Sequence, residues 1–101
     1  MRRGTTPTIK IDVKGCNLAD FDSVYVTFKQ KALSIDKFGD DLDIQNNAIS
    51  ILLSQEGTLR FDASYKYVDV QIRAVNKEGV AIASNIRQIP VEAVLKEGVI
   101  T

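Results

Sequence analysis

The stretch Ser-Val-Tyr-Val-Thr-Phe-Lys-Gln, residues 23–30, determines the fold class that we expect for this chain. Alternate residues share a face, with Val24, Val26 and Phe28 on one side and Tyr25, Thr27 and Lys29 on the other. β-Branched and aromatic residues dominate the stretch, which is the composition of a strand. A period of two with one apolar face predicts an antiparallel strand that is buried on one face only.

The same alternation recurs along the chain and predicts further strands. They cover residues 8–14, 33–38, 42–45, 48–53 and 66–76, with a return strand from Val80 to about Pro90. Asn46-Asn47 predicts a two-residue hairpin turn, because asparagine tolerates positive φ. Pro90 cannot donate a ladder hydrogen bond, so we expect the return strand to lie at a sheet edge or to carry a bulge.

Residues 54–61 interrupt this pattern. Ser54 is a good N-cap and Glu56 is favourable in a first turn, whereas Gly57 stands where a glutamate would complete a capping box. We therefore expect one short helical turn near residues 55–60, with Leu59 folded back on the core. Val91, Val94 and Leu95 are expected to add a final short strand or turn.

About seven short strands with regular turns predict an all-β fold, an immunoglobulin-like antiparallel β-sandwich. We expect an extended N-terminal arm at residues 1–7, a single domain at residues 8–97 and a C-terminal tail at residues 98–101. The predicted core is apolar and faces inward from the strands and the helical turn: Ile9, Ile11, Val13, Val24, Val26, Phe28, Ile35, Ile49, Ile51, Leu53, Leu59, Val68, Val70, Ile72, Ile82 and Ile86, with Leu18 and Phe21 as inward anchors.

Composition argues against several classes of protein. The 101 residues include 13 basic and 13 acidic side chains, so the chain lacks the basic excess typical of nucleic-acid binders. No apolar run approaches the ~20 residues that span a bilayer. Arg2 and Arg3 are followed by Gly4-Thr5-Thr6-Pro7 where a signal peptide would be apolar, so we expect no signal peptide. Cys16, the single cysteine, permits no intrachain disulfide.

Catalysis is not expected. The chain has no histidine, which removes the commonest general base and the commonest zinc ligand. It also lacks a nucleophile elbow, a phosphate-binding loop and a dinucleotide fingerprint. We expect no cofactor.

The acidic segment at residues 36–43 raises the question of a calcium site. An EF-hand loop that began at Asp41 would need glycine at position 46 and glutamate at position 52, where the chain has Asn46 and Leu52. A solvated turn between strands is favoured, and a loose cation site formed by Asp40, Asp41 and Asp43 stays open.

Two sets of residues are candidates for contacts. The first is an assembly arm that would lie across a neighbouring subunit: Arg2, Arg3, Gly4, Thr5, Thr6 and Pro7. The second is a set of exposed aromatic residues that would bind a carbohydrate or surface ligand: Tyr25, Tyr65 and Tyr67. A nucleic-acid contact through the basic N-terminal end is a weaker alternative, because these tyrosines are not interleaved with a basic run.

Four segments carry a resemblance to a known group of proteins. They are Met-Arg-Arg-Gly-Thr-Thr-Pro-Thr at residues 1–8, residues 24–30, residues 54–61, and Val-Gln-Ile-Arg at residues 70–73 followed by Ala-Ser-Asn-Ile at residues 83–86. In these segments the chain resembles small, uncharacterised proteins of about a hundred residues from phages and prophages of Gram-positive gut bacteria. Gly57 departs from the group, in which an acidic residue is more frequent.

The resemblance implies a non-enzymatic structural or assembly protein near the phage tail or baseplate. Its partners would be copies of itself or other phage structural proteins, with no membrane. Its location would be the host bacterial cytoplasm during assembly and then the virion. Arg2 and Arg3 would form salt bridges in an assembly arm. A small carbohydrate- or surface-ligand-binding module is the alternative.

Overall fold

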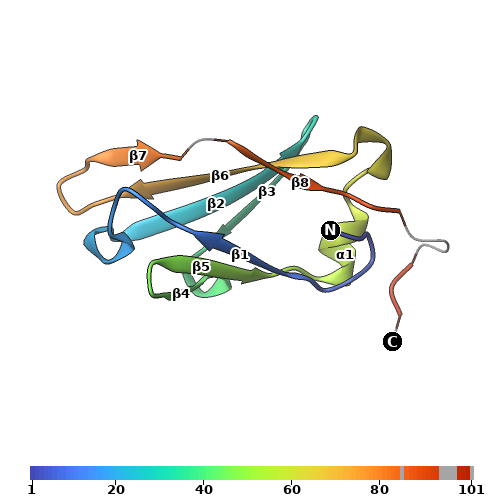
Figure 1. The fold of residues 1–101 in the computed structure, drawn as a ribbon, viewed down its shortest axis with the longest axis horizontal. Coiled ribbons are helices and arrows are strands. Elements are labelled where there is room, and N and C mark those ends of the chain that lie inside the picture. Colours follow the sequence, from blue (N-terminus) through green and yellow to red (C-terminus); the bar gives the residue numbers. More distant parts are fainter. Residues whose placement is uncertain (85, 94–97, 101) are drawn as a thin grey trace.

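A computed structural model describes residues 1–84, 86–93 and 98–100 and shows a two-layer β-sandwich (Figure 1). One sheet has the strand order β1-β5-β4, and the other has the order β3-β2-β6-β7, with β8 also paired to β6. The strands are β1 (Thr8–Asp12), β2 (Ser23–Gln30), β3 (Leu33–Phe38), β4 (Asp43–Gln45), β5 (Ala48–Leu52), β6 (Tyr67–Val75), β7 (Ala81–Ala83) and β8 (Arg87–Pro90). All pairs between these strands are antiparallel, and one isolated parallel bridge joins Arg2 to Glu92 outside them. The prediction of an all-β sandwich is confirmed.

The helical segments are short. The helix α1 (Gln55–Leu59) lies in the connection between β5 and β6 (Figure 1), and the 3-10 turns are η1 (Leu18–Asp20), η2 (Gly39–Asp41) and η3 (Ala63–Tyr65). The Ser54 side chain accepts a hydrogen bond from the Gly57 backbone N–H at 2.9 Å. The predicted N-cap and single helical turn are confirmed.

The β4–β5 hairpin turns at Asn46 and Asn47, with φ of 51° and 59°. Gln45 pairs with Ala48 across the turn, which confirms the predicted two-residue hairpin. The Asn47 amide also donates to the backbone oxygens of Val13 and Cys16 at 2.7 and 2.8 Å. This side chain therefore connects the hairpin to the segment that leaves β1.

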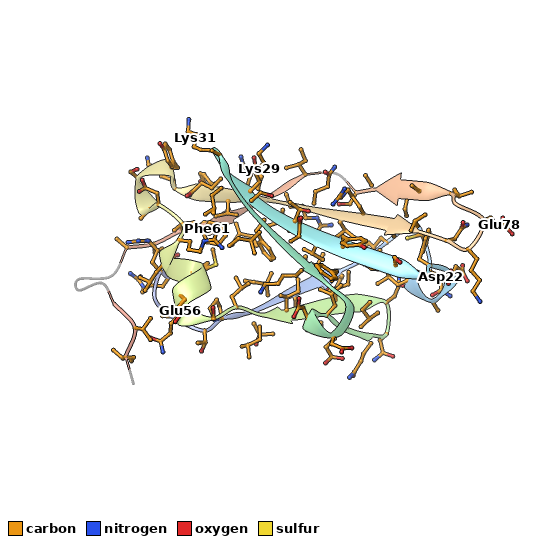
Figure 2. The ribbon with its side chains drawn as sticks, turned by 180° about the vertical axis from the view of Figure 1, so that it is seen from behind. Asp22, Lys29, Lys31, Glu56, Phe61 and Glu78 are labelled. Carbon is orange, nitrogen blue, oxygen red and sulfur yellow. The ribbon has the colours of Figure 1, made fainter. Side chains whose placement is uncertain are left out.

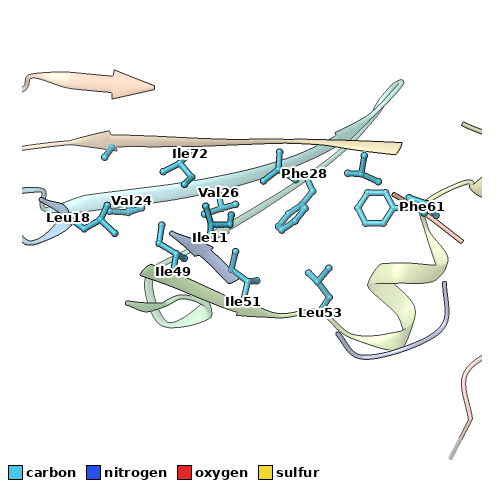
Figure 3. Packing of buried hydrophobic residues seen from close by; sticks show 14 residues of the cluster. Ile11, Leu18, Val24, Val26, Phe28, Ile49, Ile51, Leu53, Phe61 and Ile72 are labelled. Atoms are coloured by element: carbon cyan, nitrogen blue, oxygen red, sulfur yellow. The ribbon is translucent and has the colours of Figure 1, made fainter. Parts of the chain in front are cut away.

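The core fills the space between the sheets (Figure 3). From β2, Val26 and Phe28 have no exposed surface, and from β5 the same is true of Ile49 and Ile51. Predicted core residues that are buried include Ile11, Val24, Val26, Phe28, Ile49, Ile51, Leu53, Val68, Val70 and Ile72, while Ile9, Val13 and Ile35 are partly buried against them. As expected, Leu18 is buried and Phe21 packs partly buried against the core.

Several core assignments differ from the prediction, and Ala74 and Val91 join the core in addition to the predicted residues. Phe61, which the strand pattern did not identify, is only 1% exposed, and Leu59 is half-buried outside the core cluster. Ile82 and Ile86 are 40% and 62% exposed. Ile82 faces inward but lies beyond β1, where the first sheet ends, whereas Ile86 lies where the register of the return strand changes.

The predicted return strand is divided into β7 and β8, and its register with β6 shifts by one residue between them. Arg73 pairs with Ala83 in β7, but Val70 pairs with Arg87 in β8. Arg87, and not Ile86, thus occupies the position beside a buried residue. The expectation that Pro90 lies at an edge is confirmed, because Pro90 pairs with Tyr67 of β6 on one side only. Val91 is buried, whereas Val94 and Leu95 are outside the described residues.

Candidate functional site

Residues 1–7, the N-terminal segment, lie against the chain's own domain beside α1 (Figure 1). The Gly4 N–H donates to the hydroxyl of Thr58 at 2.9 Å, and that hydroxyl donates to the Thr5 backbone oxygen at 2.9 Å. The Arg3 guanidinium donates to the carbonyl oxygens of Phe61 and, at 2.7 Å, Leu59. Sequence analysis did not identify Thr58, a buried polar residue with no exposed surface, as the anchor of this segment.

The N-terminal segment also contacts the strand end that follows β8. The backbone N–H of Arg3 donates to the backbone oxygen of Glu92 at 2.9 Å, and the backbone N–H of Glu92 donates to the backbone oxygen of Met1 at 2.8 Å. The Glu92 carboxylate lies 3.8 Å from the Arg2 guanidinium and 3.9 Å from the α-ammonium group. Arg2 and Arg3 thus make contacts within one chain, and their role in assembly stays a prediction.

The turn that follows Phe61 is held by its own polar groups. The Asp62 carboxylate accepts a hydrogen bond from the Ser64 backbone N–H at 2.9 Å. This hydrogen bond, together with the nearby positive charge of Arg3, holds the pKa of Asp62 below its usual value. The buried Gln30 side chain donates to the backbone oxygen of Asp62 at 2.8 Å and accepts from the backbone N–H of Asp62 at 2.6 Å. These two hydrogen bonds attach the turn to the end of β2.

The three tyrosines do not form one platform. Tyr25 lies beside Phe38, with ring centroids 5.3 Å apart, and the Arg73 guanidinium lies 5.8 Å from the Tyr25 ring. Tyr65 and Tyr67 are both 49% exposed near the start of β6, and the Lys31 ammonium covers the Tyr65 ring at 4.8 Å. Because Tyr25 pairs with Arg73, six residues along β6 from Tyr67, the two groups are separated by roughly 20 Å.

Charged side chains lie at both ends of the sandwich. Figure 2 shows Lys29, Lys31 and Glu56 at one end and Asp22 and Glu78 at the opposite end. In the acidic segment, Asp36 accepts a hydrogen bond from the Thr27 hydroxyl at 2.6 Å. Over the described ranges, no three acidic or cysteine side chains converge on a metal-binding position. No helix within these ranges is long and apolar enough to span a bilayer.

Three of the four sheet edges in the described residues carry features that oppose pairing with another strand. On β3, Lys37 pairs with buried Val26 and so presents a charge on the inner face. β4 has only three residues. The β7–β8 edge has the register shift, Pro90 and the inner-face Arg87. Short strands, inward charges, irregular register and proline are known devices against edge-to-edge association.

The fourth edge, β1, has no such inner-face charge. Its inner-face side chains, Ile9 and Ile11, are apolar, and so is Val13, which follows the strand. On the side that faces β5, the Val13 N–H donates to the backbone oxygen of Asn47, and the Leu53 N–H donates to the backbone oxygen of Pro7. Both distances are 3.0 Å. Odd-numbered residues therefore bond to β5, because bonded pairs alternate in an antiparallel ladder.

The polar backbone groups of Thr8, Lys10 and Asp12 consequently point away from β5. They have no hydrogen-bond partner on that side within the described part of the chain. An open groove of about 430 Å³ lies along residues 11–14 at the end of this edge, between β1 and the overhanging β7 and β8. Its inner walls include Ile11, Val13, Val70 and Ile72, and its rims include Asp12, Lys14 and Arg87.

Sequence analysis did not single out this groove. The alternation at residues 8–14 predicts the strand and its faces, but it carries no information on which neighbours pair with it.

Comparison with protein-family models, with curated proteins and with solved structures gives no match for this chain.

Proposed function

We propose that this chain is a non-enzymatic structural or assembly protein that acts through protein contacts. The observation that supports the proposal is the unpaired β1 edge, because a strand with free N–H and C=O groups is a template for strand addition by another chain. The three other edges carry features that oppose pairing, which is consistent with one edge being kept for a partner.

The strand order supports an immunoglobulin-like assignment within this proposal. In that fold one sheet has the order A-B-E-D and the other contains C, F and G. Here β1-β5-β4 fits B-E-D, and β3-β2-β6-β7 fits C′-C-F-G. The position of strand A, beside β1, would then be empty.

The resemblance to phage and prophage proteins supplies the biological setting that we propose: a component of the tail or baseplate region that is made in the host cytoplasm and carried into the virion. The direct test is mass spectrometry of purified particles released by a bacterium that encodes this chain. A structural protein should remain with the particles in a constant ratio to the tail proteins. A chain recovered only from the soluble lysate would contradict the proposal.

A second candidate function is binding of a carbohydrate or surface ligand, and it rests on the outer face of the second sheet. A shallow hollow of about 460 Å³ there is lined by Tyr25 together with Arg73, Ala81 and Ala83. An aromatic ring beside a guanidinium can stack on a planar or sugar ring. Glycan-array binding that is lost in Tyr25→Ala but kept in Tyr65→Ala would favour this function, since Lys31 already covers Tyr65.

A further inference from the structure

We propose that the groove between β1 and the β7–β8 edge accepts one extended segment of a partner protein, with apolar residues at alternate positions and acidic residues between them. This inference rests on the proposed function and names the site and chemistry of the contact. In Figure 1, β7 and β8 lie above β1, and the residues that line the groove come from residues 11–14, from β6 and from the β7–β8 segment.

The backbone of β1 determines that the ligand is a strand. The N–H and C=O groups of Thr8, Lys10 and Asp12 point away from β5 without partners in the described part of the chain, and Asp12 lines the groove. An added strand satisfies such a row of alternating donors and acceptors. We expect the antiparallel orientation that β1 already has with β5.

The apolar walls determine one face of that strand. Ile82 pairs with buried Ala74 and thus faces the inside of the sandwich, yet its side chain is 40% exposed. It is exposed because the first sheet ends at β1 and no strand lies opposite. A smaller hollow, lined by Ile82, Val13 and Leu18, continues the groove under β7. Apolar side chains at alternate positions of the added strand would cover these surfaces.

The charges around the groove determine the other positions. Lys14 and Arg87 lie on its rims beside one acidic residue, Asp12. Lys10 lies on the solvent face of β1, where Asp12 and Asp43 line the same hollow. Both ion pairs of the described residues involve Glu92, so none of these three cations forms a salt bridge there. Cross-strand pairs of opposite charge are stabilising and like pairs are destabilising. Acidic residues opposite Lys10 and Lys14 are therefore favoured.

The same charges argue against the N-terminal segment of a second copy as the occupant. That segment contains Arg2 and Arg3 and no alternating apolar residues. Its arginines would approach Lys10, Lys14 and Arg87, so the electrostatic interaction would be repulsive.

The test uses the full chain and a fluorescent, end-capped peptide, Glu-Val-Thr-Ile-Glu-Val-Thr, which places glutamates opposite Lys14 and Lys10 in an antiparallel pair. Fluorescence anisotropy should show saturable binding that weakens with added salt. A charge-reversed peptide with lysine in place of both glutamates, and a scrambled peptide of the same composition, should bind at least about tenfold more weakly. Lys14→Glu, which reverses the charge opposite one peptide glutamate, should weaken binding of the original peptide by a similar factor.

Two further measurements locate the contact. Peptide binding should slow hydrogen exchange at the amides of Thr8, Lys10 and Asp12 and leave the other strand edges unchanged. Lys10→Pro removes an N–H that faces away from β5, so the fold should survive while binding is lost. Lys10→Ala is the matched control, because it removes the charge but keeps the N–H. Circular dichroism and urea unfolding verify that each variant is folded.

The proposal is overturned by equal binding of the scrambled or charge-reversed peptide, by unchanged exchange at the three β1 amides, or by no binding up to millimolar peptide. Self-association of the chain through the same amides would also overturn it, in favour of a second copy as occupant. These results do not depend on whether the chain is found in phage particles. Failure of the groove assignment and failure of the proposed function are therefore distinguishable.

Discussion

Thr58→Val tests whether the N-terminal segment is part of the folded domain. Valine has nearly the same shape as threonine but cannot replace the hydroxyl, which accepts from the Gly4 N–H and donates to the Thr5 oxygen, both at 2.9 Å. Two hydrogen bonds with a net contribution of about 1 kcal/mol each give an expected loss of about 2 kcal/mol in the free energy of unfolding. For a domain of this size, that loss corresponds to a decrease of about 10 °C in Tm.

The assay is urea unfolding followed by circular dichroism, with Thr58→Ser as the matched variant that keeps the hydroxyl and loses one methyl group. Thr58→Ser should lose about 1 kcal/mol from methyl burial, and its Gly4 amide should stay protected from hydrogen exchange. In Thr58→Val the exchange of the Gly4 amide should accelerate.

A truncated background gives the decisive comparison. In a chain without residues 1–5, Thr58 keeps only its hydrogen bond to the Gln55 backbone oxygen at 3.1 Å, so Thr58→Val should cost about 1 kcal/mol less there than in the full chain. An equal loss of stability in the full and truncated chains would refute the reasoning, since the hydroxyl would then act only within α1. The truncated chain itself should be less stable than the full chain, whatever its oligomeric state in light scattering.

Other substitutions and conditions test further parts of the structure. Asn47→Ala should lower the free energy of unfolding by about 2–3 kcal/mol, because it removes three side-chain hydrogen bonds. Asn47→Gly should lose less, because glycine adopts the positive φ of this position without strain. Equal losses in urea unfolding would contradict a contribution from backbone strain. Phe61→Ala should lose about 3–5 kcal/mol, since the ring is only 1% exposed, and a stability unchanged from wild type would place the ring outside the core. The lowered pKa of Asp62 means that its contribution to stability is present above about pH 4 and is lost as the pH falls through the lower folded-state pKa. Unfolding of Asp62→Asn should therefore depend less on pH in this acidic range, and an unchanged pH dependence would contradict the assignment.

The strands and their turns could be predicted because the information that determines them is local. Alternation at residues 23–30 distinguishes a buried face from a solvated one, and Asn46-Asn47 selects a turn that requires two positive φ angles. Ser54 likewise marks the start of α1 through a hydrogen bond to a residue three positions away. Each of these features depends on neighbours along the chain.

The contacts of the N-terminal segment could not be predicted in the same way. Its partners, Thr58 and Glu92, are more than fifty residues away, and the contacts are polar and have no periodicity. Arg2 and Arg3 look like a free basic arm in the sequence because nothing nearby pairs with them. The structure instead places both side chains against backbone carbonyl groups of their own chain.

The errors at Ile82 and Ile86 have separate physical causes, and one of them bears on function. Ile86 was misplaced because the register shift between β7 and β8 gives the inner-face position to Arg87, and alternation cannot reveal a shift of one residue. Ile82 was correctly assigned to the inner face, but periodicity does not show whether the opposite sheet extends far enough to cover it. Its exposure therefore marks the place beside β1 where a strand is lacking. A partner strand in the groove would bury a side chain that the sequence already identifies as core.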